Sequence, residues 1–399
     1  MGILNRERVG KQNEFNNSDM SEKRNIPISL PSTGLEEWEA VKVPIMSGWL
    51  TSGPKVREFE VMFAERHKVK HAIAVTSATT ALHLALVALD IGPGDEVIVP
   101  AFTWVSTANV VLHQGAEVVF CDVDTKTFNL DPAQLSTKIT SKTKAIMAVH
   151  LFGLCVDMDA IKLAAPGIPI IEDGACAAGA AYKGQPAGGL GIMGCFSFHP
   201  RKSVTTGEGG MITTNDDRLA EKLSILRNHG ASVSEEQRHH GAQPYILPDF
   251  DVCGYNYRMT DLQGALGCVQ LGKLDQFIDE RAKWAQYYVD ELSEIEWLSL
   301  PVYSQDFKHG WQSYVTIVDE SKSPMSRNEI MQKLLDMGIS TRPGTHAVHM
   351  LGFYSKKYGL QPTDFPGAQA SNNFSMAIPL HNRMTLEDFE YVVETLKSL

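Results

Sequence analysis

The feature that most restricts the fold of this chain is the regular alternation of two kinds of segment between residues 71 and 230. Short apolar runs alternate with longer stretches in which apolar residues recur every three or four positions. The short runs are typical of buried strands and the longer stretches of helices. Strands that alternate with helices favour a largely parallel sheet with helices on both faces. The expected strands are residues 71–77, 96–100, 117–123, 145–153, 169–175, 191–199 and 211–214.

Helices are expected between these strands and after them. Beyond residue 255, a long helical pattern is followed by a strand at 313–319 and by two further helices. This mixture is typical of an α+β domain. The expected helices are residues 54–67, 79–92, 102–115, 131–139, 156–165, 216–230, 255–292, 326–338 and 385–399.

The length of the chain indicates more than one domain. With 399 residues, 43% of them apolar, it exceeds the size at which a single hydrophobic core stops growing. Residues 1–35 are polar without a sustained period, so we expect a flexible N-terminal arm that is pinned near Ile26–Leu30. We then expect a large domain at residues 36–275, which contains the sheet, and a smaller C-terminal α+β domain at residues 276–399.

Charge and cysteine content exclude several classes of protein. The formal net charge of −11 argues against binding to nucleic acid or to an anionic membrane. The six cysteines stand singly without a metal-ligand spacing, so we expect reduced thiols in a cytoplasmic protein and no metal site. No signal-like stretch opens the chain, and no apolar run approaches transmembrane length.

One lysine stands in a position that suits covalent catalysis. The segment CFSFHPRKSVTTGEGG, residues 195–210, places Lys202 in a polar turn at the mouth of an apolar strand. Poor hydration there disfavours the ammonium form, and a neutral amine can form a Schiff base with a carbonyl. Taken alone, however, a lysine in a turn is more often a solvated charge.

This segment resembles the lysine loop of the DegT/DnrJ/EryC1/StrS family, the pyridoxal-phosphate aminotransferases of sugar and antibiotic biosynthesis. The resemblance extends from about Gly48 to the C-terminus. It implies the fold of the type I aspartate aminotransferase superfamily, with pyridoxal 5'-phosphate as the cofactor and Lys202 as its Schiff-base residue. The matching positions are Ser197, Phe198, His199, Lys202, Thr206, Glu208, Gly209 and Gly210.

Pyridoxal-phosphate enzymes also need a carboxylate that keeps the pyridine nitrogen protonated. Asp173 follows an apolar strand, at the carboxyl edge where open α/β sheets bind ligands. A buried aspartate needs a cation, and the protonated nitrogen is one. The sequence alone allows Asp173 to be a helix cap instead; the resemblance implies the cofactor role. Many members of the family carry Gln three residues later, near the cofactor's phenolic oxygen, where this chain has Cys176.

The cofactor phosphate needs an anion site, and the turn at residues 76–80 opens a helix. Unpaired N–H groups and the helix dipole suit a dianion there, although a Ser/Thr cluster can equally be a simple cap. The resemblance implies that Ala78 and Thr79 bind the phosphate, together with Ser197 from the lysine loop. Ala78 stands where the family usually has Gly, so it can contribute only its backbone.

Two further cofactor residues follow from the resemblance. Trp104 stands where the family places an aromatic ring over the cofactor, although a lone tryptophan is otherwise more often a core residue. Asn256, in the segment GYNYRMTD, corresponds to an asparagine that reaches the phosphate of the other subunit. The resemblance therefore implies a homodimer with shared active sites.

The sequence indicates loops, rather than single contacts, for the binding of the substrate. The loops of His199, Tyr255 and His349 match those that the family sets around the mouth of the site, and His381 falls on another recurring histidine. The pair at 239–240 lies in a polar loop and is expected to be solvated rather than metal-binding.

The resemblance implies an aminotransferase that moves an amino group from an amino acid, expected to be glutamate, to a keto or aldehyde sugar. A nucleotide-linked sugar is expected, in the biosynthesis of cell-surface polysaccharide or of secondary metabolites. An unactivated acceptor, such as an oxidised octulosonate or a keto-cyclitol, stays open. So do a nonenzymatic regulator and a pyridoxal-phosphate-dependent sugar dehydratase, although such dehydratases have His in place of Lys202. A dinucleotide-binding protein is excluded because no G-x-G-x-x-G opens a helix.

Overall fold

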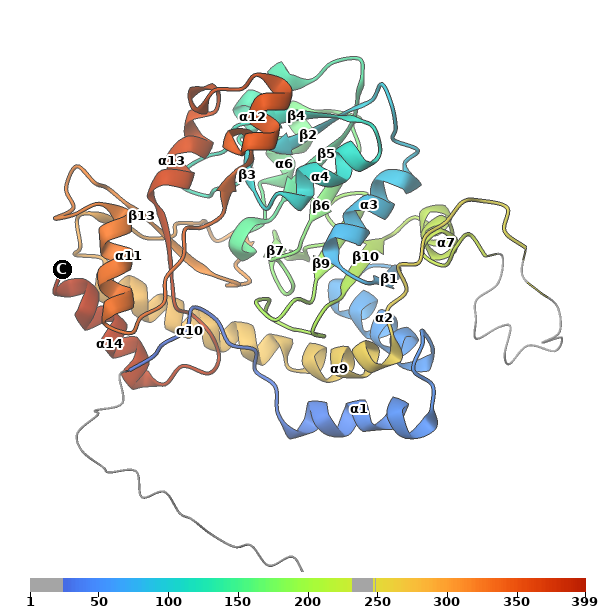
Figure 1. Cartoon of the computed structure of the whole chain (residues 1–399), viewed down its shortest axis with the longest axis horizontal. Helices are drawn as coiled ribbons and strands as arrows, with labels where there is room; N and C mark the ends of the chain where they lie inside the picture. The colour runs from blue at the N-terminus through green and yellow to red at the C-terminus, as the bar shows by residue number, and fades with distance from the viewer. Residues whose placement is uncertain (1–23, 232–246, 248) are drawn as a thin grey trace, which may run out of the picture.

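The computed structural model describes residues 24–231, 247 and 249–399, and Figure 1 shows how the elements are arranged. The main sheet is built from the apolar runs that the sequence predicts as strands. Its members are β1 (His71–Val75), β2 (Glu96–Pro100), β4 (Glu117–Cys121), β5 (Thr143–Val149), β6 (Ile170–Asp173), β9 (Met193–Ser197) and β10 (Gly210–Thr214).

These strands form a seven-stranded sheet with the order β1-β10-β9-β6-β5-β2-β4. Every neighbouring pair from β9 to β4 is parallel. The strand β10 runs antiparallel to both β1 and β9. The prediction of a mostly parallel sheet is therefore confirmed, and the carboxyl ends of β6 and β9 lie side by side at one edge.

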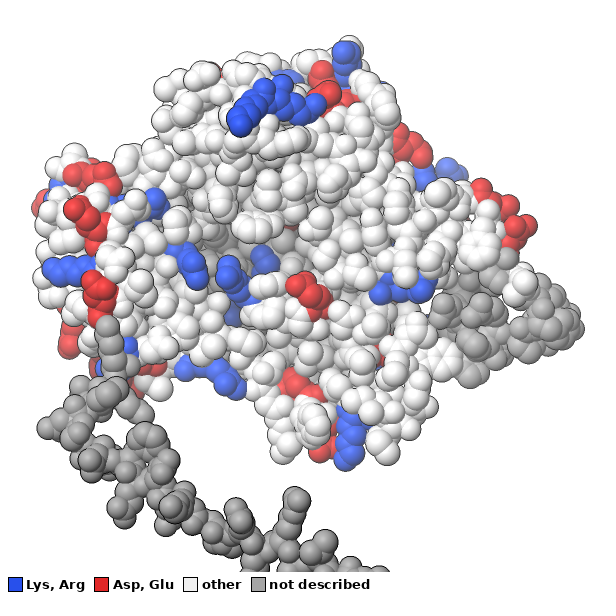
Figure 2. Space-filling view, viewed as in Figure 1, with Lys and Arg blue, Asp and Glu red and all other residues white. Residues whose placement is uncertain are grey.

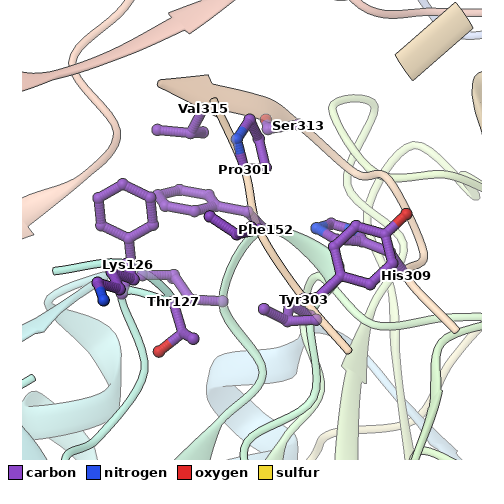
Figure 3. A pocket seen from close by; sticks show the side chains of 12 residues that line it. Lys126, Thr127, Phe152, Pro301, Tyr303, His309, Ser313 and Val315 are labelled. Atoms are coloured by element: carbon purple, nitrogen blue, oxygen red, sulfur yellow. The ribbon is translucent and has the colours of Figure 1, made fainter. Parts of the chain in front are cut away.

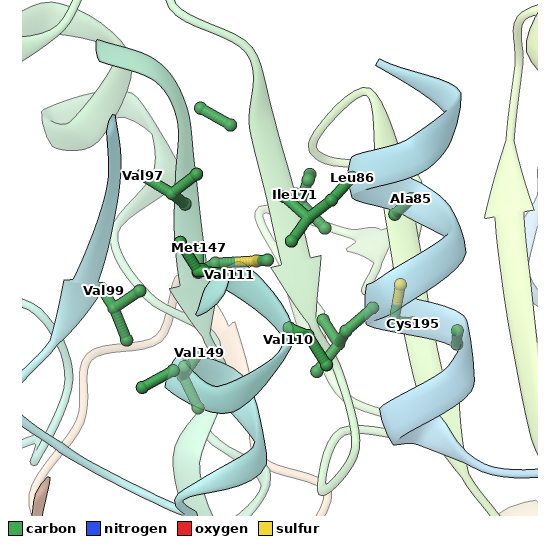
Figure 4. Packing of buried hydrophobic residues seen from close by; sticks show 14 of the residues in the cluster. Ala85, Leu86, Val97, Val99, Val110, Val111, Met147, Val149, Ile171 and Cys195 are labelled. Atoms are coloured by element: carbon green, nitrogen blue, oxygen red, sulfur yellow. The ribbon is translucent and has the colours of Figure 1, made fainter. Parts of the chain in front are cut away.

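Both faces of the sheet are buried, because alternate side chains of a strand point to opposite sides. Val97 and Val99 pack in one apolar cluster, while Ile98 between them packs in another. Figure 4 shows the first cluster, in which the sheet meets the side chains of two helices that cross it. The helices around the sheet are α2 (Pro54–His67), α3 (Ala78–Ala88), α4 (Ser106–His113), α5 (Pro132–Leu135), α6 (Met158–Ala164) and α7 (Asp217–Leu226).

Two expected helices differ from the structure. The helix predicted to begin at residue 102 begins at Ser106, because Phe102–Thr103 form strand β3 and pair with β14 (His346–Ala347). The pattern over 255–292 is divided into α9 (Asp261–Gly272) and α10 (Leu274–Leu292). The first difference arises from a strand partner more than 240 residues away, which no local pattern contains.

Helices α1 (Leu35–Ser47), α12 (Gly352–Tyr358) and α13 (Pro366–Phe374) were not predicted. Helix α1 contains Pro44 and exposes several apolar side chains. It packs on α9 and forms the outermost helix at the lower edge of Figure 1. The chain before it is anchored as predicted near Ile26, whose amide donates to the Gly338 carbonyl over 2.7 Å. The rest of the predicted arm, residues 1–23, lies outside the described residues.

The C-terminal part forms a second, three-stranded antiparallel sheet with its own apolar cluster. Residues 346–368 nevertheless return to the main sheet, where Val348 and Tyr354 join its cluster. The division at residue 275 stays a prediction. The remaining strands and helices are β7 (Ala181–Tyr182), β8 (Gln185–Pro186), β11 (Leu298–Ser299), β12 (Phe307–Lys308), β13 (Tyr314–Val318), α11 (Arg327–Asp336), α12 (Gly352–Tyr358), α13 (Pro366–Phe374), β15 (Ser375–Ile378) and α14 (Leu386–Lys397), with 3₁₀ turns at Ser136–Lys138, Leu151–Gly153, Val348–Met350 and Pro362–Asp364.

Candidate active site

Lys202 lies in the loop between β9 and β10, at the carboxyl edge of the sheet. The loop is held by its own backbone: the Phe198 amide donates to Gly209 O over 2.9 Å and the Lys202 amide to His199 O over 2.8 Å. The half-buried Lys202 side chain turns inward, and its Nζ donates to Cys176 Sγ over 3.1 Å. The structure therefore brings together the two predicted residues that are 26 positions apart in the sequence.

Asp173 ends the strand next to the lysine strand, and it is 5% exposed. The Thr107 hydroxyl donates to its Oδ2 over 2.8 Å, and the Ala175 amide donates to its Oδ1 over 3.2 Å. Burial raises the pKa of the Asp173 carboxyl, and these hydrogen bonds and the charge of Lys202 offset this only in part. A cationic ring nitrogen placed against Asp173 would supply the missing counter-charge.

Thr107 was not predicted from the sequence, although it orients this carboxylate. Its hydroxyl also lies 3.1 Å from the Thr103 hydroxyl, and both side chains are buried. The available signal is the spacing of four residues between two threonines around a helix start. Thr107 also connects Trp104 to the site, because the Thr107 amide donates to Trp104 O over 3.1 Å.

The predicted phosphate residues meet at the start of α3. Ser77 caps this helix by accepting the Thr80 amide, and the first helical hydrogen bond runs from the Ala81 amide to Ser77 O over 3.0 Å. The amides of Ala78 and Thr79 therefore precede the first amide that donates within the helix, and such free N–H groups suit an anion. A Cβ on Gly210 would lie 2.4 Å from the Ser77 backbone, so only glycine allows β10 to begin there.

The start of β10 also lies beside Ser197, another predicted phosphate ligand. Gly210 pairs with Ser197 on one side and with Val75 on the other. Ser197 therefore lies one strand away from the chain that leads into α3. Trp104 is 58% exposed, and its ring meets His346 edge-on at a centroid distance of 5.6 Å. It is thus not a core tryptophan, and more than half of its surface is accessible.

Next to Asp173 in the chain, Glu172 forms a buried hydrogen-bonded pair with His150. His150 Nδ1 accepts the Val156 amide, so its Nε2 carries the proton and donates to Glu172 Oε2 over 2.9 Å. Both side chains are fully buried. Although burial opposes ionisation, the hydrogen bonds from His150 and from loop amides hold the pKa of the Glu172 carboxyl below its usual value. The His150 amide also donates to Asp173 O, so this pair helps to hold the end of β6 in place.

The predicted substrate residues differ in burial: His199 and Tyr255 are half-buried, whereas His349 is fully buried. His199 is half-buried beside Lys202, and Tyr255 stacks on Tyr257 with a centroid distance of 5.1 Å. His349 is 0% exposed and its Nε2 donates to Pro362 O over 3.2 Å. The structure therefore does not place His349 at a surface that a substrate can reach, because Phe365 packs against its ring.

Two further predicted residues, His381 and Asn256, have their described contacts outside the lysine loop. His381 is also buried, with its Nε2 on Pro27 O. Asn256 is exposed on a loop whose backbone bridges to Asn228. The histidine pair at 239–240 lies outside the described residues. Within the described ranges there is no group of three His, Cys, Asp or Glu side chains that could hold a metal ion.

A crevice lies apart from these residues, and Figure 3 shows its lining. It is formed by the segments that follow β4 and β5, closed by a C-terminal segment at 301–315. None of the predicted cofactor residues lines it, so it is separate from the cluster around Lys202. Its lining residues are Lys126, Thr127, Phe128, Leu151, Phe152, Leu154, Pro301, Val302, Tyr303, His309, Ser313 and Val315.

Comparison with known proteins identifies this arrangement. The model of the DegT/DnrJ/EryC1/StrS aminotransferase family matches residues 31–397. The chain belongs to this family. It is 40% identical over 385 residues to the spore coat polysaccharide biosynthesis protein SpsC of Bacillus subtilis, covering 95% of this chain and 99% of SpsC.

Solved structures of this family agree with the fold. The putative sugar aminotransferase Spr1654 from Streptococcus pneumoniae, in its PMP-form, is 31% identical with a TM-score of 0.87, covering 94% of this chain and 98% of that one. PseC from Helicobacter pylori, an aminotransferase involved in the biosynthesis of pseudoaminic acid, is 25% identical with a TM-score of 0.86, covering 94% and 99%. This family member is therefore a pyridoxal-phosphate-dependent enzyme of the sugar aminotransferases.

The residues present fit this cofactor. An anion cradle at α3, a buried and under-compensated carboxylate, an amine and an exposed aromatic ring are the groups that pyridoxal phosphate needs. When bound, the cofactor supplies an electron sink for the carbon that exchanges its amino group. In the part of the chain that the structure describes, none of the helices has the length and apolar character to cross a membrane.

Proposed function

We propose that this enzyme transfers the amino group of glutamate to a keto or aldehyde sugar that is linked to a nucleotide. The observation that supports the transfer itself is the placement of Asp173 at the end of β6 and of Lys202 in the loop after the adjacent parallel strand β9, where the charge of Lys202 acts on the Asp173 carboxyl. A polysaccharide is the proposed destination of the aminated sugar, supported by the name of SpsC, a spore coat polysaccharide biosynthesis protein.

Each residue has a proposed task. Lys202 supplies the amine to which the cofactor is attached. It then carries a proton between the substrate carbon and the cofactor carbon that exchange the amino group. Asp173, oriented by Thr107, keeps a proton on the ring nitrogen. The residues proposed to bind the cofactor are Ala78, Thr79, Trp104, Asp173, Cys176, Ser197 and Lys202, with Asn256 from a second subunit, and those proposed to face the substrate are His199 and Tyr255.

The surface around the site supports a charged sugar. A keto acid needs mainly one arginine for its carboxylate, whereas a sugar nucleotide needs scattered polar groups and several cations for its diphosphate. Figure 2 shows Lys and Arg side chains around a hollow near the centre of one face. Arg201, which directly precedes Lys202, is exposed. This arrangement favours the nucleotide-linked acceptor over an unactivated keto-sugar.

The acceptor is tested by half-reactions. The enzyme is first converted to its amine form with glutamate and freed of 2-oxoglutarate; keto acids, unactivated keto-sugars and nucleotide-linked keto-sugars are then added separately. We expect only the nucleotide-linked sugars to restore the visible absorbance of the aldehyde form rapidly. Efficient recovery with pyruvate or oxaloacetate and with no sugar contradicts the sugar proposal. Recovery with an unactivated sugar alone contradicts only the nucleotide part.

We also propose that the active unit is a homodimer. Helix α1 exposes Leu35, Trp38 and Met46, and Trp38 and Met46 are 66% and 77% exposed in the single chain. Large apolar side chains gathered on one helix are typical of an interface. Asn256 is likewise exposed on its own chain, which suits a role in the neighbouring site.

A subunit-mixing experiment tests the shared site. Lys202→Ala and Asn256→Ala subunits are each expected to be almost inactive, but a hybrid dimer contains one site with both native residues. After exchange, the mixture should regain about a quarter of wild-type activity, because half of the dimers are hybrids with one intact site. Mixing Lys202→Ala with Asp173→Ala is the control, since both residues belong to one subunit's site. Equal behaviour of the two mixtures contradicts the shared site.

A further inference from the structure

Arg281 lies at a junction of three chain segments and is buried, with 6% exposure. From α10, its Nε donates to Asn382 Oδ1 over 2.8 Å. Its Nη1 donates to Ser203 Oγ and to Trp311 O, each over 3.2 Å. These partners come from the lysine loop, from the segment before β13 and from the turn before α14.

All three acceptors are neutral oxygens. The preceding carboxylate, Glu280, accepts Asn382 Nδ2 over 2.7 Å, and no described carboxylate forms an ion pair with Arg281. Burial lowers the pKa of the Arg281 guanidinium to about 10, so it stays charged at neutral pH. A buried charge that forms no ion pair is unfavourable: the charge of the neighbouring Glu280 offsets the burial of Arg281 only in part, and a well-packed apolar side chain is often as stable in such a place or more so. A purely structural role therefore explains the residue poorly.

Ser203 directly follows Lys202, so Arg281 holds the catalytic loop on one side of the lysine. On the other side, Gln312 Nε2 donates to the backbone oxygen of Arg201 over 3.0 Å. Both contacts connect the loop to the segment around Trp311. The lysine loop is thus held before Lys202 by Gln312 of this segment and after Lys202 by Arg281, which also binds the segment at Trp311 O.

The anchoring segment is itself fixed. His309 stacks on Trp311 with a centroid distance of 3.9 Å, and its Nδ1 accepts the Trp311 amide over 2.8 Å. Trp311 has a φ of 46°, which a non-glycine residue keeps only when its surroundings enforce it. The amides of Gly310 and Gln312 donate to the turn that follows β5. The segment therefore connects the turn after β5 to the lysine loop by hydrogen bonds at both ends.

We propose that Arg281 is a positioning residue for Lys202: it locks the lysine loop to the C-terminal segment so that the amine stays beside Asp173 and Cys176. This inference rests on the proposed function. A lysine side chain is long and flexible, so the place of its amine depends on how firmly its backbone is held. Small displacements of a reacting group reduce turnover more than binding.

The test compares Arg281→Met and Arg281→Lys with a matched control. Arg327 is also a buried arginine that donates to backbone oxygens, at Ser375 O over 2.7 Å, but it lies on α11 without a contact to the lysine loop. Hydrogen exchange of the cofactor-free protein is followed over residues 198–206. We expect exchange about 10-fold faster in Arg281→Met and unchanged in Arg327→Met. Ser203→Ala, which removes only the loop end of the contact, is the second variant should Arg281→Met not fold.

Kinetics provide the second readout. Arg281→Met should lower kcat by about 10- to 100-fold with KM for the amino donor within about twofold; Arg281→Lys should recover part of kcat. Equal exchange in the two methionine variants, or an unchanged kcat in Arg281→Met, overturns the proposal. The exchange experiment needs no cofactor: if wild type transfers no amino group, the proposed function fails and exchange alone decides the anchoring.

Discussion

Replacing Lys202 with alanine is expected to abolish amino transfer in a protein that remains folded. The variant lacks both the amine that holds the cofactor and the group that carries the proton, so turnover should fall by about 10⁴-fold or more. Stability should change little, because Lys202 is half-buried and its Nζ makes one described hydrogen bond, to Cys176. Turnover with glutamate and unfolding in denaturant measure the two effects.

Chemical labelling tests the same assignment without a variant. Borohydride reduction of the cofactor-loaded wild type should leave the label on the peptide that contains Lys202. Lys183 is a suitable control, since it is exposed and paired with Asp159, and Lys183→Ala should keep both label and activity. A label on any other lysine, or an active Lys202→Ala, contradicts the assignment.

Replacing Asp173 with asparagine is expected to slow amino transfer without lowering the stability of the cofactor-free protein. Loss of a buried charge partner typically costs about 3–5 kcal/mol, which corresponds to about 10²- to 10³-fold or more in the half-reaction with glutamate. The cofactor-free protein should not be destabilised. Burial raises the pKa of Asp173, so its contribution to stability is present at low pH and is lost as pH rises through that raised value.

The neighbouring carboxylate provides the control. The pKa of Glu172 is lowered, so its contribution is present at neutral pH and is lost only on acidification. Glu172→Gln should therefore destabilise the cofactor-free protein at pH 7 by about 1–3 kcal/mol, whereas Asp173→Asn should not. Denaturant titrations at two pH values measure both. An Asp173→Asn enzyme with the wild-type half-reaction rate contradicts the proposed role.

The local part of the fold was predictable from the sequence, whereas the cofactor roles of Lys202 and Asp173 stay predictions. Short apolar runs indicated the strands of the main sheet, and a lysine and an aspartate at strand ends could be assigned by resemblance. Thr107 was missed, because its contact with Asp173 joins residues 66 positions apart. The buried Glu172 was missed for a similar reason, since the amides that donate to it belong to a loop that no periodicity describes.

Burial was the property that the sequence predicted least well. His349 was expected to face a substrate, but its ring packs inside the protein against Phe365. Helix α1 was not expected, because its apolar side chains lie on the surface of the single chain and Pro44 interrupts the pattern. In both cases a distant segment or a proposed second subunit, not the local sequence, decides the environment.

The pairing of β3 with β14 has a consequence for how the protein is made. The strand beside Trp104 obtains its partner from residues 346–347, near the end of the chain. Ribosomes deliver the N-terminal strands first, so the main sheet can assemble while this edge still lacks its partner. The strand edge beside Trp104 is therefore complete only after a segment more than 240 residues further along the chain has been synthesised and has returned to the main sheet.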